Sequence, residues 1–219
     1  SHTKENQELA LRVAREGIVL LKNEKNLLPL RKNIKSIAII GPNADDRLNQ
    51  LGDYTPKVVP QEIETVLKGI KDKVSENTKI TYVKGCNVIG NELNEISKAQ
   101  KAARNADVAI VVVGENERRA AKKTGTDGEG LDVESLDLTG LQEELIEAVF
   151  KSGTPTIVVL INGRPLSIRW AAENVPAIIE AWNCGEKGGQ ALAEIIFGDC
   201  NPSGRLSVTV PRSAGQLPM

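Results

Sequence analysis

The chain has 219 residues and a net charge of −1, and its residues are 40% hydrophobic, 26% charged and only 3% aromatic. This length suits one sizeable α/β domain or two small ones, with a core large enough to need neither disulfide nor metal for stability. Basic and acidic residues are mixed along the chain, which argues against nucleic acid or a membrane surface as a partner. The scarcity of aromatic residues favours a core of Ile, Val, Leu and Ala, as in strands covered by helices.

Histidine and cysteine are too few and too scattered for several common kinds of site. The single histidine, His2, lies in the N-terminal tail, so we expect neither a histidine-based triad nor a histidine metal site. Cys86, Cys184 and Cys200 have neither metal-binding nor redox spacing, and their odd number argues against a disulfide framework. We therefore expect no metal and no cofactor. The longest apolar run, residues 156–162, is too short to span a bilayer.

Predicted strands and helices alternate along the chain. Apolar, β-branched runs predict strands at 34–40, 80–83, 107–114, 156–162, 176–182 and 206–210. Apolar residues at helical spacing predict helices at 4–21, 61–74, 91–105, 139–151, 165–171 and 188–197. This alternation predicts an α/β fold with a mostly parallel sheet of about five to six strands and helices on both faces. No linker composition interrupts it, so we expect residues 1–219 to form one domain.

Three polar regions follow predicted strands and are the candidates for a functional site. They are residues 41–55, residues 114–138, and residues 162–165 together with 183–189. Ligands of open α/β sheets bind at the carboxyl ends of the strands, where these loops should meet. The loop at 114–138 has no periodicity of its own, and loops of that length inside a compact domain are usually functional or disordered.

A nucleotide-binding domain is one alternative, but its motifs are missing. The sequence contains neither G-x-G-x-x-G nor G-x-x-x-x-G-K-[ST]. The glycine-rich stretch 185–189 precedes a predicted helix and could hold an anion at the helix N-terminus, although a tight turn into the helix is the favoured interpretation. A serine nucleophile is also poorly supported, because there is no G-x-S-x-G elbow.

One acidic residue of the long loop has unusual neighbours. Glu129 stands between Gly128 and Gly130, so its backbone is flexible enough to carry a carboxyl group into a pocket. There it could act as a general acid. Residue type alone favours a plainer interpretation, a solvated loop carboxylate, because charged loop residues are mostly exposed.

A series of motifs in a specific order resolves this choice. The motifs lie at 14–23 (AREGIVLLKN), 27–30 (LLPL), 37–43 (IAIIGPN), 52–54 (GDY), 85–86 (GC), 111–114 (VVVG), 128–132 (GEGLD), 136–138 (LDL), 142–146 (QEELI), 162–165 (NGRP), 182 (W), 185–189 (GEKGG), 197–199 (FGD) and 201–206 (NPSGRL). Each is weak alone, but their order and spacing are specific. Over nearly the whole chain the sequence resembles the α/β-sandwich domain of glycoside hydrolase family 3, the β-glucosidase and β-xylosidase family.

The resemblance implies a retaining, exo-acting β-glycosidase that removes terminal β-D-glucosyl or β-D-xylosyl residues. In that family an aspartate nucleophile lies on an N-terminal β/α-barrel domain, and the α/β sandwich supplies the acid/base glutamate. The matching glutamate here is Glu129. The loop of Asp53 and Tyr54 matches a region that contacts substrate, although a purely structural role for Tyr54 is equally plausible. Val133 stands where the family often has arginine, which leaves the fine structure of the loop open.

The resemblance covers one of the family's two domains, and no barrel is found in these residues. We therefore expect a fragment of a larger enzyme that hydrolyses no glycoside by itself. We also expect the loop at 114–138 to be poorly ordered or displaced, with Glu129 facing a partner domain. The alternative function is a non-catalytic module that packs against another domain or binds carbohydrate.

Overall fold

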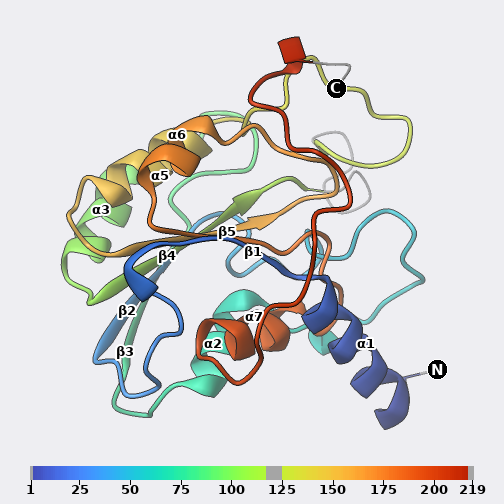
Figure 1. Ribbon diagram of the computed structural model, residues 1–219, viewed down its shortest axis with the longest axis horizontal. Coiled ribbons are helices and arrows are strands. Elements are labelled where there is room, and N and C mark those ends of the chain that lie inside the picture. Colours follow the sequence, from blue (N-terminus) through green and yellow to red (C-terminus); the bar gives the residue numbers. More distant parts are fainter. Residues whose placement is uncertain (1, 117–124, 217–219) are drawn as a thin grey trace.

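A twisted sheet forms the centre of the computed structural model, which describes residues 2–116 and 125–216 (Figure 1). The six strands lie in the order β1-β6-β5-β4-β2-β3. Their bounds are β1 (Val19–Asn23), β2 (Ser36–Ile40), β3 (Lys79–Val83), β4 (Val108–Gly114), β5 (Thr156–Ile161) and β6 (Ala177–Glu180). Strands β2 to β6 are parallel, and β1 pairs with β6 in the antiparallel direction. The predicted α/β class and mostly parallel sheet are confirmed.

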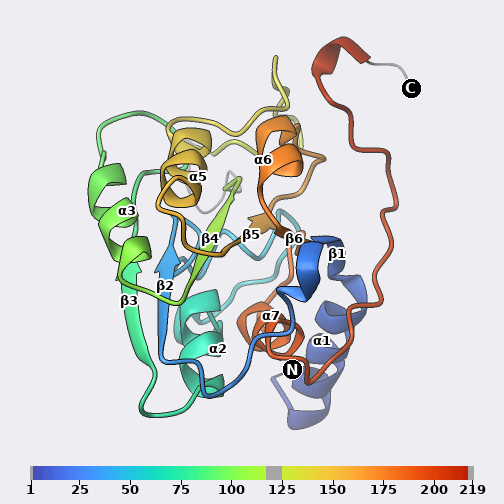
Figure 2. The same ribbon diagram turned by 60° about the vertical axis from the view of Figure 1, so that its left-hand side comes forward.

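Helices cover both faces of the sheet, which gives the three layers seen in Figures 1 and 2. One layer contains α1 (Lys4–Gly17), α2 (Val66–Lys73) and α7 (Gly188–Ile196). The other contains α3 (Ile96–Arg104), α5 (Gln142–Phe150) and α6 (Arg169–Asn174). Alternate residues of each strand enter opposite core clusters: Ile110 of β4 packs on the first side and Val111 on the second. This alternation is why a central strand must be apolar at every position.

The central strands β4 and β5 end at the same level of the sheet. Gly114 pairs with Ile161 at the end of their parallel register. A Cβ on Gly114 would lie 2.0 Å from the Ile161 carbonyl oxygen, so only glycine fits at this close approach. The residues that follow, Glu115 and Asn162, therefore begin neighbouring loops at the carboxyl edge of the sheet.

Strand β1 was not predicted, because its residues were assigned to the preceding helix. Helix α1 instead ends at Gly17, and the next residue, Ile18, is extended. Residues Val19–Asn23 then pair with β6 at the edge of the sheet. The apolar run at 18–21 has no period that separates strand from helix, so the available partner strand decides its conformation.

The prediction of a strand at 206–210 is wrong. These residues form no strand, and Leu206 and Val208 are 42% and 46% exposed. The segment runs along the outside of the molecule past β1 and α1, in red in Figure 2. The Gly204 N–H donates to the Ile18 carbonyl and fixes the start of the segment. A short alternation of apolar residues is insufficient for a strand where no pairing follows.

Several helices begin later than predicted, because capping and tight turns occupy their first residues. Helix α2 begins at Val66, where the Thr65 side chain accepts the Lys68 N–H, and a 3-10 turn at Pro60–Glu62 precedes it. The helix predicted at 165–171 forms at Arg169–Asn174. Within residues 2–116 and 125–216, no helix is both long enough and apolar enough to cross a membrane.

Candidate active site

The three predicted loop regions meet at the carboxyl edge of the parallel strands. The Asn43 side chain, after β2, donates to the Glu115 carbonyl after β4 at 3.0 Å. The Gln50 side chain reaches the Gly185 carbonyl after β6 at 2.9 Å. Parallel strands bring these loops together because all their carboxyl ends lie at one edge. The expectation that these three loops meet at one edge of the sheet is therefore confirmed.

Glu129 is exposed at the surface of this edge, on the loop after β4. Its neighbours Gly128 and Gly130 have φ angles of +124° and +70°, in the region that favours glycine. The Glu129 N–H donates to Asp53 Oδ2 at 2.8 Å, which links two loops far apart in the sequence. The two glycines hold the peptide in a conformation that side-chain-bearing residues adopt at a cost.

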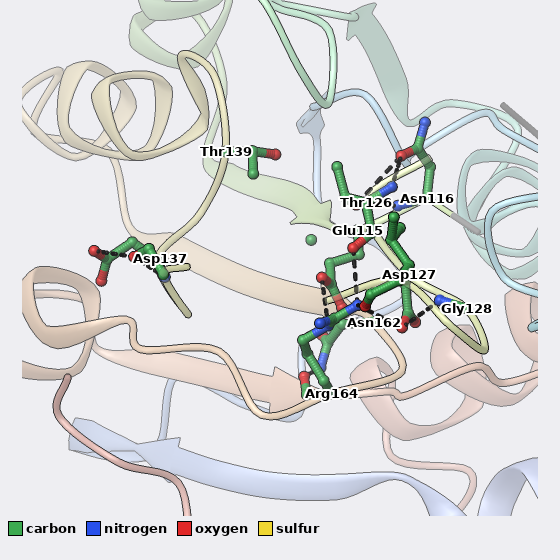
Figure 3. Close-up of polar contacts among 12 residues, drawn as sticks. Glu115, Asn116, Thr126, Asp127, Gly128, Asp137, Thr139, Asn162 and Arg164 are labelled. Atoms are coloured by element: carbon green, nitrogen blue, oxygen red, sulfur yellow. Dashed lines mark hydrogen bonds and ion pairs between the residues drawn. The ribbon is translucent and has the colours of Figure 1, made fainter. Parts of the chain in front are cut away.

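Arg164 connects the loop to the sheet (Figure 3). Its Nη2 lies 2.9 Å from the Thr126 carbonyl oxygen, 3.3 Å from Asp127 Oδ1 and 3.3 Å from the Leu131 carbonyl oxygen. Its Nε lies 3.1 Å from Oε1 of the buried Glu115. One guanidinium group therefore joins the first residue after β4 to a segment that includes Glu129.

The base of the loop is closed by Asn116 and Thr126. The Thr126 N–H donates to the Asn116 carbonyl at 2.9 Å, and the Asn116 N–H donates to Thr126 Oγ1 at 3.1 Å. Residues 125–138 are therefore attached to this domain, and for them the expectation of a displaced loop is wrong. Residues 117–124 of the same prediction lie outside the described part. The physical reason for the difference is Arg164, whose side chain supplies the loop's contacts with the sheet.

Two buried carboxyl groups lie beneath the loop. Burial is the main cause that raises the pKa of Glu115 to about 7, with a smaller contribution from the Asp127 charge, while Arg164 lowers it. Burial also raises the pKa of Glu180, at the end of β6, to about 7. The Trp182 N–H and the Asn162 side chain donate to Glu180 at 3.0 and 3.3 Å. Both carboxyl groups therefore keep their protons to a higher pH than an exposed glutamate does.

Asp53 and its neighbour Tyr54 lie on the loop after β2, and Asp53 contacts Glu129 directly. Asp53 is partly buried and accepts the Glu129 N–H, so the structure brings these two predicted site residues together. Tyr54 is 77% exposed. A hollow of about 830 Å³ lies among residues that include Asp45, Lys84 and Asn116. Glu129 is not among the residues that line it.

The glycine-rich stretch before α7 is a tight turn, as favoured from the sequence. The Gly188 N–H donates to the Gly185 carbonyl, and the Gly189 N–H donates to the Glu64 carbonyl. Lys187 pairs with the Glu64 carboxylate at 2.6 Å. These backbone donors are already used within the protein, which leaves them unsuited to an anion. Among the described residues, no three His, Cys, Asp or Glu side chains are grouped as metal ligands would be.

Sequence reasoning did not single out Glu115, Glu180 or Arg164. Glu115 and Glu180 stand at the ends of apolar strands, where a polar residue usually marks the start of a solvated loop. The signal for Arg164 was present, since Asn162-Gly163-Arg164-Pro165 was among the recognised motifs. The motif alone could not show what the guanidinium group contacts, because its partners come from a different loop.

The sequence and the fold are both similar to those of known glycoside hydrolases. The model of the glycosyl hydrolase family 3 C-terminal domain matches residues 18–219. The chain belongs to this family.

Similar proteins come from several organisms. A beta-xylosidase of Formosa agariphila is 46% identical over 99% of this chain, and a periplasmic beta-glucosidase of Salmonella typhimurium is 37% identical over 100%. The chain spans 30% of the length of each of these two relatives. Among solved structures, a beta-glucosidase of Erythrobacter marinus superposes with a TM-score of 0.86 at 37% identity, covering 100% of this chain and 32% of that one. A Listeria innocua beta-glucosidase in complex with isofagomine gives 0.86 at 30% identity, with 99% and 28% covered.

Proposed function

We propose that this chain is the acid/base-bearing domain of a larger, retaining, exo-acting β-glycosidase, and that Glu129 is its general acid/base. The substrates are β-linked glucosides or xylosides, the two classes named for its relatives. The observation that carries the proposal is the placement of Glu129. Its carboxyl group is exposed at the carboxyl edge of the sheet, on a peptide held by Asp53. A group that must approach a substrate held by another domain needs this combination of exposure and fixed position.

In the proposed mechanism the nucleophile lies outside these residues, on an N-terminal β/α barrel. Its carboxylate attacks the anomeric carbon, and Glu129 donates a proton to the glycosidic oxygen as the C–O bond breaks. The ionised Glu129 then removes a proton from water, which attacks the glycosyl-enzyme and releases the sugar with its configuration retained. Tyr54 and Asp53 are proposed to lie near the substrate. The exposed ring of Tyr54 suits stacking against a sugar or aglycone.

The proposal is tested with Glu129→Gln in the full-length enzyme. General acid/base catalysis contributes roughly 10²- to 10⁴-fold, so kcat/KM for an alkyl β-glycoside should fall by about that factor. A 2,4-dinitrophenyl glycoside leaves without protonation, so its kcat/KM should change little, and azide should raise its kcat by replacing activated water. Glu134→Gln, an exposed acid of the same loop, is the matched control and should keep full activity.

The same experiment separates this function from a non-catalytic packing or carbohydrate-binding module. Unchanged kinetics for Glu129→Gln with both leaving groups would favour the module. The 219-residue chain should also hydrolyse neither aryl β-glucosides nor aryl β-xylosides by itself, because it supplies only one of the two carboxyl groups. Robust turnover by the isolated chain would contradict the proposed division of the site between two domains.

A further inference from the structure

We infer that Arg164 is a positioning residue for the acid/base glutamate, because it fixes the segment that contains Glu129 to the end of the central strands. This inference rests on the proposed function of Glu129. It assigns a role to a side chain that is neither the acid/base nor a proposed substrate contact. The argument follows from where the guanidinium group lies and what it joins (Figure 3).

The contacts of Arg164 enclose the glutamate in the sequence. Thr126 precedes Glu129 by three residues and Leu131 follows it by two, and Nη2 of Arg164 reaches the carbonyl oxygens of both. A short segment held at both ends has few conformations left. A third contact, from the Glu129 N–H to Asp53, holds the middle of the segment from the opposite loop. Together these bonds restrict where the Glu129 backbone can lie.

Arg164 anchors the loop and is itself held by contacts with the end of the central strands. Arg164 lies three residues after the end of β5, and the Asn162 side chain donates to the Arg164 carbonyl at 2.9 Å. Its Nε faces Glu115, which is only 6% exposed, at 3.1 Å. This contact, together with those of Nη2 to the loop, restrains the guanidinium group from two sides. The planar group then sets the distance between Glu115 and the loop.

Gly163 shows that the loop lies directly on this anchor. A Cβ placed on Gly163 would be 1.9 Å from Asp127 Oδ2, so the Asp127 side chain packs against the glycine backbone. The Asp127 carboxylate in turn faces Arg164 Nη2 and accepts the Gly128 N–H at 2.8 Å. The Asn-Gly-Arg-Pro motif thus combines close approach at the glycine with bridging by the arginine.

Lysine cannot reproduce this bridge. Lysine keeps the charge, but its three N–H donors all lie on one nitrogen. Arginine instead reaches Glu115 through Nε and the loop carbonyls through Nη2, two nitrogens fixed in one plane. Arg164→Lys in the full-length enzyme should therefore loosen Glu129 without removing it. Misplacing a catalytic group by about 1 Å costs up to roughly 100-fold, and we expect kcat/KM for an alkyl β-glycoside to fall about 10- to 100-fold.

The dependence on the leaving group distinguishes positioning from general damage. kcat/KM for a 2,4-dinitrophenyl glycoside should fall less than about threefold, because its departure needs no proton. In a Glu129→Gln background, Arg164→Lys should cause almost no further loss, since residues that act as one unit are non-additive. Arg205→Lys is the matched control: Arg205 is exposed and also donates to two backbone carbonyls, those of Ser203 and Gly204. It should match the parent enzyme.

If Arg164→Lys does not fold, the double variant Glu115→Gln with Arg164→Gln carries the same test. It replaces both members of the Arg164–Glu115 pair, which is better tolerated than loss of one. Equal losses for both leaving groups, or additive losses with Glu129→Gln, would overturn the inference. If Arg164→Lys is harmless while Glu129→Gln shows its leaving-group effect, only the inference about Arg164 fails. If Glu129→Gln is harmless, the proposed function fails first.

Discussion

Replacing Glu180 by glutamine should make the chain more stable at neutral and alkaline pH. Glu180 ends β6 and is only 2% exposed. Burial raises its pKa from 4.5 to about 7; the Trp182 N–H and Asn162 oppose this by hydrogen bonding to the ionised form, and Glu115 adds to it. The uncharged amide of glutamine resembles the protonated acid, and its oxygen can still accept the Trp182 N–H.

The sign follows from proton binding in the two states. Between pH 4.5 and 7 the folded state holds a proton at Glu180 that the unfolded state has released. The free energy of unfolding therefore falls as the pH rises through this window and is constant outside it for this group. Each pKa unit corresponds to about 1.4 kcal/mol, so the shift of Glu180 from 4.5 to about 7 changes the free energy of unfolding by about 3 kcal/mol across this window. Glu115, with a pKa also raised to about 7, acts in the same direction.

The assay is urea unfolding of the 219-residue chain from pH 4.5 to 8. We expect Glu180→Gln to match the parent near pH 4.5 and to exceed it by up to about 3 kcal/mol at pH 8. Glu194 titrates outside this window. Burial alone would raise its pKa, but hydrogen bonds from Arg15 and Gln190 lower it, so the stability that ionised Glu194 contributes is lost only at more acidic pH. Equal pH dependence of variant and parent, or a less stable variant at pH 8, would refute this reasoning.

Two further predictions concern the packing of α2. A Cβ on Gly69 would lie 2.0 Å from the Gly189 carbonyl oxygen of α7. Gly69→Ala should therefore destabilise the chain by about 1–3 kcal/mol in urea unfolding. The control is Gly17→Ala, where nothing lies within 4 Å of the added Cβ, and it should be neutral or stabilising by up to about 1 kcal/mol. Thr65→Ala removes the acceptor of the Lys68 N–H and should cost about 1 kcal/mol by thermal unfolding; Thr65→Ser keeps the oxygen, and an equal loss in both variants would show that the cap is unimportant.

Much of the sheet could be predicted because its central strands are apolar on both faces. The runs around Val108–Gly114 and Thr156–Ile161 were assigned within a residue or two, since every position of β4 and β5 is buried. Strands at the edge of the sheet are harder to predict from the sequence. Val19–Asn23 is only partly buried and follows a helix without a polar break, so its sequence suits either structure. Pairing with β6 decides between them.

The candidate site could likewise be predicted only in part from the sequence. Motif order led to Glu129 and its loop, and strand order placed the three loop regions at one edge of the sheet. The contacts between loops were beyond prediction, since the Asp53 carboxylate and the Glu129 N–H are separated by many residues and meet only after folding. The same holds for Arg164, whose partners lie after a different strand.

The sequence by itself determined the α/β class and the central strands, and it singled out the glycine-flanked Glu129 as the candidate acid/base. These features depend on local patterns: apolar runs, turn residues and the order of motifs. Only the tertiary structure decided that the loop rests on this domain, that a guanidinium group bridges it to a buried carboxyl, and that 206–210 is no strand. Such features depend on which distant groups share a low-dielectric environment and can pair there, and linear spacing does not encode that proximity.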